Sequence, residues 1–129
     1  MYALIVDLKV DVNQAIESLR QALQTEKMGI VSDVDFQANM KEKMNHEMAA
    51  YRILGICGPK YAKRIVEAEP TIGAMMPCSC AVYDTGSGVT RIAMQMPEVM
   101  ASVTENTEVK SAMNEARQSL DRVMALLKK

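Results

Sequence analysis

The stretch from Tyr51 to Asp84 constrains the fold of this chain more than any other, because two strand-like segments there flank one helix. The residues from Ala50 to Cys57 form the first of these predicted strands, and Gly58 and Pro59 end it. Pro59 suits the first turn of a helix, where no backbone N–H is needed, and Pro70 stops that helix. The stretch also contains all three cysteines of the chain, so the predicted strand–helix–strand unit is the place to look for chemistry.

The residues before this stretch predict two further strands and two helices. Apolar residues alternate over 2–10, which predicts a strand. Asp11 is a typical N-cap residue for a helix that continues to about Lys27. A second strand is expected over 30–35, and a four-residue spacing of apolar residues predicts a short helix over 36–45.

The residues after Pro70 predict a hairpin and a long helix. The arms of the hairpin are expected at 75–83 and 89–96, joined by a glycine-containing loop of five residues. The helix is expected over 106–127, with an apolar stripe along one side. The predicted order is β-α-β-α-β-α-β-β-α within a single domain, residues 1–129. It favours an α+β fold in two layers, with helices packed on one face of a mainly antiparallel sheet.

Charge and hydropathy bear on the classes of partner. The formal net charge of the 129 residues is −1, so the chain lacks the basic excess that neutralises phosphates, and no nucleic-acid partner is expected. The apolar runs are far shorter than the roughly 20 residues of a membrane span, and no membrane association is expected. An odd number of cysteines without a secretory signal favours a cytoplasmic location.

Two motifs in the central stretch resemble a known family. Residues 51–59, Y-R-I-L-G-I-C-G-P, resemble the Y-[RK]-I-L-G-x-C-N-P signature of the domain of unknown function 302 family. Residues 67–78, E-A-E-P-T-I-G-A-M-M-P-C, resemble the family's E-x-x-P-x-I-G-x-L-L-P-C stretch. The resemblance implies a TATA-binding-protein-like α+β fold, without DNA binding, and a compact homodimer. Gly58 departs from the usual asparagine of the family, and Cys80 adds a further thiol.

Cys57 is the candidate catalytic or reactive thiol. It precedes a helix N-terminus, where free N–H groups favour negative charge, and Lys60 adds a positive charge nearby. This setting favours the thiolate and predicts that Cys57 reacts ahead of Cys78 and Cys80. The alternative interpretation is a small, buried cysteine at a strand end. The predicted ligand-binding residues around this turn are Tyr51, Cys57, Pro59, Lys60 and Cys78.

A second candidate site is a patch of sulfur atoms on the hairpin. Cys78 and Cys80 are two residues apart, so their side chains are expected on one face of the strand. If the five-residue loop sets the register, Cys78 lies across from Met94. Thiols and thioethers are the ligands of soft metals such as Cu(I). The alternative, which the high methionine content favours, is that this face is ordinary core.

These candidates leave three functions open, and no cofactor is identified from the sequence. The chain is expected to be a homodimeric module that binds or senses a small molecule in a cysteine-containing pocket. It could instead carry out thiol redox or sulfur transfer through Cys57, or bind a soft metal through Cys78, Cys80 and methionines. A catalysed reaction is not identified, because no Ser-His-Asp set or paired carboxylates can be recognised.

Overall fold

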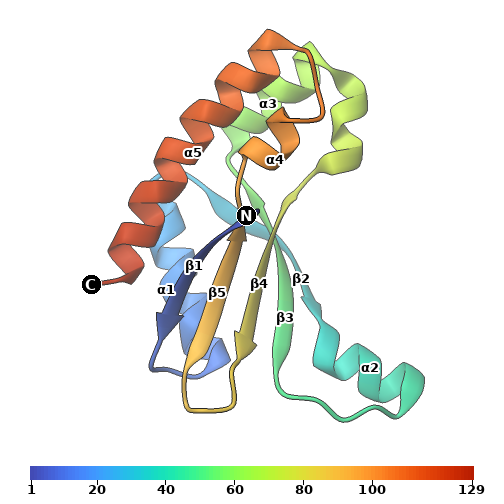
Figure 1. Ribbon diagram of the computed structural model, residues 1–129, viewed down its shortest axis with the longest axis vertical. Coiled ribbons are helices and arrows are strands. Elements are labelled where there is room, and N and C mark those ends of the chain that lie inside the picture. The colour runs from blue at the N-terminus through green and yellow to red at the C-terminus, as the bar shows by residue number, and fades with distance from the viewer.

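The computed structural model describes all residues, 1–129, as a two-layer α+β structure. Figure 1 shows the sheet with α1 behind it, and with α3 and α4 beyond one end of the strands. The strands are β1 (Ala3–Leu8), β2 (Gly29–Asp35), β3 (Tyr51–Cys57), β4 (Cys78–Asp84) and β5 (Thr90–Gln95). The helices are α1 (Val12–Gln24), α2 (Phe36–Met44), α3 (Pro59–Ala68), the 3-10 helix η1 (Pro70–Met75), α4 (Glu98–Ala101) and α5 (Thr107–Leu127).

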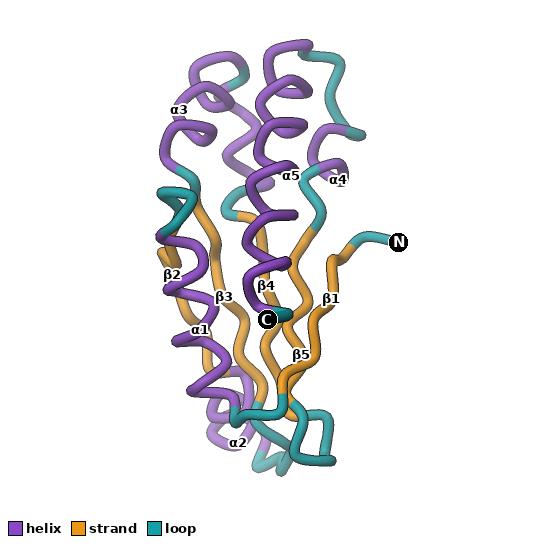
Figure 2. The backbone as a smooth tube through the Cα atoms, turned by 90° about the vertical axis from the view of Figure 1, so that its left-hand side faces the viewer, coloured by secondary structure: helices purple, strands orange, loops and turns teal.

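All five strands join one open sheet in the order β1-β5-β4-β3-β2, and every neighbouring pair is antiparallel. The helices α1 and α5 lie on the same side of this sheet (Figure 2). The predicted α+β class, the antiparallel sheet and the helical layer are therefore confirmed. No helix is long and apolar enough to cross a membrane.

The main core lies between the sheet and the helices α1 and α5. Its sheet side is formed by alternate residues such as Leu54, Val82 and Ile92, each of which is at most 1% exposed. The helices contribute the predicted stripes, and Leu19 and Val123 are completely buried. Burial of one such side chain is worth roughly 1.5–3 kcal/mol relative to leaving it exposed.

A second, smaller core lies beyond the end of the sheet, between α3, η1, α4 and α5. Its central side chains include Ile65, Met100 and Val109, which are at most 1% exposed. The helix α5 is long enough to serve both cores, because its 21 residues rise about 30 Å at about 1.5 Å per residue. The two cores therefore meet along α5 at the ends of β3 and β4.

The helix boundaries follow from their capping residues. The Asp11 carboxylate accepts a hydrogen bond of 2.8 Å from the Gln14 amide, as the sequence predicted, and Asp35 caps α2 in the same way. The Asn106 side chain accepts from the amides of Glu108 and Val109 at the start of α5. Gly58 is the N-cap of α3 and offers no side-chain cap, while Pro59 occupies its first turn.

The hairpin register differs from the prediction by two residues. Cys80, not Cys78, lies across from Met94, and Val82 lies across from Ile92. The cause is the position of the loop, because Asp84 pairs with Thr90 and the loop begins one residue later than predicted. A shift of two residues preserves the face to which each side chain points.

The first hairpin arm is also shorter than predicted. The residues Pro70–Met75 form the 3-10 helix η1, and β4 begins only at Cys78. Pro70 stops α3, as predicted, but it then starts η1 rather than leading into a strand. A proline is readily placed in the first turn of a helix, and its fixed backbone angle suits that position.

Candidate functional site

The candidate functional site is an apolar pocket of about 290 Å³ at the junction of the two cores. Thirteen of its sixteen lining residues are hydrophobic. Its walls come from the ends of β3 and β4, from the loop before β4, and from α3, α4 and α5. A pocket with this lining offers few polar groups to a ligand, so it favours an apolar ligand.

Cys57 and Cys78, two of the residues singled out from the sequence, both line this pocket. Cys57 is the last residue of β3, and Cys78 is the first residue of β4. Cys78 pairs directly with Ile56, the residue before Cys57, so the two cysteines lie on adjacent strands. Both cysteines are free and partly exposed.

The two pocket thiols differ in electrostatic setting from the third cysteine. Burial raises the pKa of the Cys78 thiol, and the neighbouring Cys57 raises the same pKa further. Burial also raises the pKa of Cys80, to about 12, because that side chain is completely enclosed in the main core. Cys80 is therefore a neutral packing residue at any ordinary pH.

The sulfur patch predicted on the hairpin is not an accessible site. Cys80 and Met94 are both completely buried in the main core, and neither lines the pocket. Of the predicted set, only Cys78 reaches the pocket. No group of three or more histidine, cysteine, aspartate or glutamate side chains lies close enough together to hold a metal ion.

Four methionines complete the sulfur content of the pocket, and the sequence analysis placed none of them beside Cys57. They are Met28, Met76, Met100 and Met113. Met28 follows α1, Met76 lies just before β4, and the other two come from α4 and α5. No spacing in the sequence links these segments, so only the folded chain brings the four thioethers together with the two thiols.

Of the predicted ligand-binding residues, Lys60 lies beside the pocket rather than in it. Its ammonium group stands over the ring of Tyr61, 5.0 Å from the ring centre, and Tyr61 lines the pocket. Pro59 is exposed and does not line the pocket either. Both residues belong to the first turn of α3, whose N-terminal end carries positive potential.

Tyr51 lies elsewhere. Its ring stacks on the ring of Tyr83, with the two ring centres 5.0 Å apart. The ring of Phe36 is tilted against it, with a distance of 5.6 Å between ring centres. It lines a separate hollow on the opposite sheet face, together with Ala81 and Ala93. Tyr51 is the first residue of β3 and Cys57 is the last, so the length of the strand separates the start of the family-like motif from its cysteine.

Gly58 lines the pocket at a position that has no room for a side chain. A Cβ atom built on Gly58 would approach Cδ2 of Tyr61 to 2.8 Å and Cε of Met28 to 3.3 Å. Both neighbours line the pocket, so the missing side chain at Gly58 leaves room for them there. A larger residue there would have to displace them.

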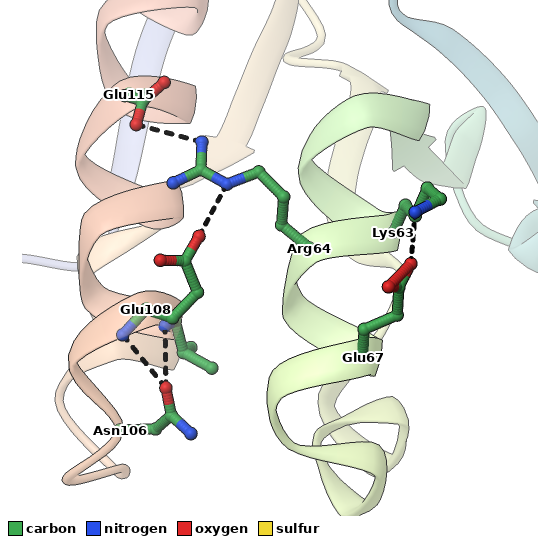
Figure 3. A network of polar contacts seen from close by, with 7 residues as sticks. Lys63, Arg64, Glu67, Asn106, Glu108 and Glu115 are labelled. Carbon is green, nitrogen blue, oxygen red and sulfur yellow. Dashed lines mark hydrogen bonds and ion pairs between the residues drawn. The ribbon is translucent and has the colours of Figure 1, made fainter.

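Polar contacts hold the helical walls in place. Arg64 of α3 donates to Glu108 at 2.8 Å and to Glu115 at 2.9 Å on α5, as Figure 3 shows. Inside the wall, the Tyr61 hydroxyl lies 2.7 Å from the Ser119 hydroxyl, and Ser119 is 2% exposed. Arg64 is thus paired with two carboxylates of α5.

Other polar residues of the chain form no comparable site. Arg52 pairs with Asp33 on β2, and His46 is exposed in the loop before β3. A polar hollow of about 500 Å³ lies at the other end of the sheet, near the start of α1. Two of its carboxylates, Asp11 and Asp35, are already engaged as helix caps.

Comparisons with known proteins agree with this architecture. The model of the family described as Domain of unknown function DUF302 matches residues 4–127. A solved structure, an uncharacterized conserved protein DUF302 from Bacillus stearothermophilus, is similar with a TM-score of 0.87 and 24% sequence identity. The match covers 98% of each chain, and at that identity it shows the shared fold. No curated protein matches the chain.

Proposed function

Because this chain belongs to the family described as Domain of unknown function DUF302, whose description assigns no activity, we propose a function from the pocket itself. The protein binds a small apolar molecule between the thiols of Cys57 and Cys78 and the helical wall. The observation that carries this proposal is an apolar pocket of about 290 Å³ with two free thiols in its lining.

The size and lining of the pocket limit the ligand. About 290 Å³ lies just below the roughly 300–1,000 Å³ typical of small-molecule pockets, so the ligand must be small. Four methionine side chains provide adaptable, polarizable walls, which suit flat or irregular apolar molecules. No charged side chain lines the pocket, so a strongly ionised ligand would lose hydration without compensation.

The proposal is tested by titrating the protein with naphthalene or indole and monitoring the methyl signals of labelled methionines by NMR. The methyl signals of Met28, Met76, Met100 and Met113 should shift on titration, whereas the signal of Met94 in the main core should not. Ala62 of α3 lines the pocket, and Ala62→Phe should fill it and abolish the shifts. Ala125→Phe, on an exposed part of α5, is the matched control. Unchanged methionine signals in the wild-type protein would contradict the proposal.

The homodimer expected from the sequence is proposed here through the uncovered face of the sheet. Directly paired residues form an apolar row across all five strands on that face, namely Ile5, Ala93, Ala81, Ile53 and Val34. Ile5 is 46% exposed and Val34 is 43% exposed, so no helix covers these large apolar side chains of the sheet. We call these residues the apolar row.

The apolar row suits a second copy of the same chain. Its small central alanines border a hollow of about 420 Å³, while its ends carry larger exposed side chains. A two-fold interface needs such a protrusion and hollow on one surface, because each copy presents the same patch. The charged pair on this face, Arg91 and Asp7, is joined by a hydrogen bond of 2.8 Å and adds no net charge.

The area of the uncovered face also fits a dimer. Five strands spaced about 4.8 Å apart, with about six residues each, span about 24 by 20 Å, or roughly 500 Å² before side-chain relief. Specific interfaces bury about 800 Å² of accessible surface on each partner, and accessible surface exceeds the projected area. The projected area of the face is therefore of the same order as one side of a specific interface.

Sedimentation analysis at tens of micromolar tests this interface. The wild-type protein should sediment as a dimer, and Ile5→Lys and Val34→Lys should each produce a folded monomer. Val103→Lys is the matched control, because Val103 is 62% exposed after α4, outside the apolar row. A monomeric wild-type protein, or dissociation by the control alone, would refute the proposed interface.

A further inference from the structure

We propose that the pocket is a binding site for a soft monovalent metal ion, represented in cells by Cu(I), held by the Sγ atoms of Cys57 and Cys78 with thioether support. The inference goes beyond the proposed function, because it assigns to the same pocket an ion that displaces the two thiol protons and is therefore compensated by thiolates, as an ionised organic ligand would not be. It departs from the hairpin set considered from the sequence, since Cys80 and Met94 are enclosed in the main core.

The donor set is the first argument. Six sulfur-bearing side chains, two cysteines and four methionines, line one pocket of about 290 Å³. Thiolate and thioether ligands select Cu(I), whereas imidazole and carboxylate ligands suit harder ions. The pocket lining contains no histidine, aspartate or glutamate. A structural Zn²⁺ site needs four nitrogen, sulfur or carboxylate ligands, and the pocket offers two.

The position of the two thiols is the second argument. Cys57 ends β3 and Cys78 begins β4, and the direct partner of Cys78 is Ile56, the residue before Cys57. Both cysteines line the same pocket, so their thiols face one cavity at this end of the sheet. Both cysteines are free and partly exposed, so an ion can reach them from solvent.

Met76 is the methionine best placed to supply a thioether. It lies two residues before Cys78, at the C-terminal end of η1, and is half-buried in the pocket lining. Met28, Met100 and Met113 are each at most 8% exposed and form the apolar surround. Such a surround keeps water from the ion and from the thiols.

The charge of the bound state is the third argument. Binding replaces the protons of two thiols by one Cu⁺, so two protons leave and the site carries one net negative charge. The N-terminal end of α3, which has no side-chain cap, and the Lys60 ammonium over Tyr61 supply positive potential beside the pocket. The ion enters as Cu(I) and leaves as Cu(I), so no electron transfer is involved.

Competition titration tests the site. The native protein is titrated anaerobically with Cu(I), held reduced by ascorbate, against the chromogenic chelator bathocuproine disulfonate, and separately with Ag(I). One equivalent should bind. Loss of a supporting residue of a metal site typically costs about 10–100-fold in affinity, so Cys57→Ser and Cys78→Ser should each cost at least that much. Met76→Leu should weaken binding by a smaller factor.

Cys80→Ala is the matched control, because that thiol is completely buried outside the pocket, and it should bind Cu(I) as the wild-type protein does. Wild-type affinity in both serine variants would overturn the site, and so would equally tight binding of Zn²⁺. The naphthalene titration separates this inference from the proposed function. Naphthalene binding without Cu(I) binding overturns the metal site alone, and absence of both overturns both.

Discussion

Cys80 lies directly across from Met94 in the β4–β5 ladder, and both side chains are completely buried. The pair connects two strands at the centre of the main core, where an adaptable thioether and a small thiol fill space between the sheet and the helices. The third cysteine of the chain is therefore part of the packing, and only Cys57 and Cys78 have thiols in the pocket lining.

The three thiols should react in a fixed order. With limiting iodoacetamide on the native protein, Cys57 should be labelled first, Cys78 more slowly and Cys80 only after unfolding. The reason is that the thiolate is the nucleophile, and burial raises the pKa of Cys78 and raises that of Cys80 to about 12. Peptide mapping gives the order. Labelling of native Cys80 at a rate similar to that of Cys57 would contradict the enclosed core.

The label order should also change with pH in a defined direction. Raising the pH increases the thiolate fraction of Cys78, so its labelling should approach that of Cys57 at alkaline pH. The mapping experiment is repeated at several pH values, with guanidinium-unfolded protein as the control in which all three thiols are equally exposed. A Cys78 rate that does not depend on pH would contradict the raised pKa.

The sequence predicted the layers and the element order of this fold because both depend on local patterns. Asp11 identifies a helix start whatever follows, and the apolar stripe of α5 requires a buried face. The alternation in β4 and β5 also placed Cys78 and Cys80 on the correct face, since a slip of two residues leaves every face unchanged.

The pocket could be predicted only in part, because it depends on contacts between distant segments. Cys57 and Cys78 were identified from the strand–helix junction and the family-like motifs. Met28 and Met113 reach the same pocket from opposite ends of the chain, and no local pattern predicts that. Tyr51 was wrongly grouped with Cys57, because six residues of extended strand separate its side chain from the pocket by about 20 Å.

Gly55 should tolerate no side chain. A Cβ atom there would lie 2.3 Å from Oγ of Ser32 and 2.6 Å from Cγ of Pro77. Gly55→Ala should lower the free energy of unfolding by about 1–3 kcal/mol, the usual cost of overpacking. The matched control is Gly73→Ala, because a Cβ atom at Gly73 meets nothing within 4 Å. Urea unfolding measures both, and equal effects of the two substitutions would contradict the close approach of Pro77.

The buried hydrogen bond between Tyr61 and Ser119 should stabilise the junction of α3 and α5. Tyr61→Phe removes the hydrogen bond of 2.7 Å to the Ser119 hydroxyl, which keeps its contact with Arg122, and should cost about 0.5–1.5 kcal/mol in the free energy of unfolding. In the double variant with Ser119→Ala, the cost should be less than the sum of the single costs, because the bond can be lost only once. Tyr2→Phe, at a residue that is 75% exposed, serves as the control.

Additive costs of Tyr61→Phe and Ser119→Ala would show that the two hydroxyls do not depend on each other. Because Tyr61 also lines the pocket, the same variant should slightly change the naphthalene-induced shift of Met113 while leaving binding intact. That outcome would connect the packing of the second core to the shape of the pocket.

The contact between Glu26 and Arg122 should make stability fall in acid. Arg122 of α5 donates to Glu26 at 2.8 and 3.0 Å, and these hydrogen bonds lower the carboxyl pKa of Glu26 from its ordinary value of 4.5. A carboxyl whose pKa is lower in the folded state stabilises that state above the ordinary pKa and loses this effect as the pH falls through the folded pKa.

Urea unfolding at pH values from 7 down to about 3 should therefore show a declining free energy of unfolding, and Arg122→Gln should flatten part of that decline. Lys110→Gln is the matched control, since it removes a cation from an exposed position on the same helix that forms no ion pair. An identical pH profile for Arg122→Gln and Lys110→Gln would show that the link between α1 and α5 does not depend on this pair.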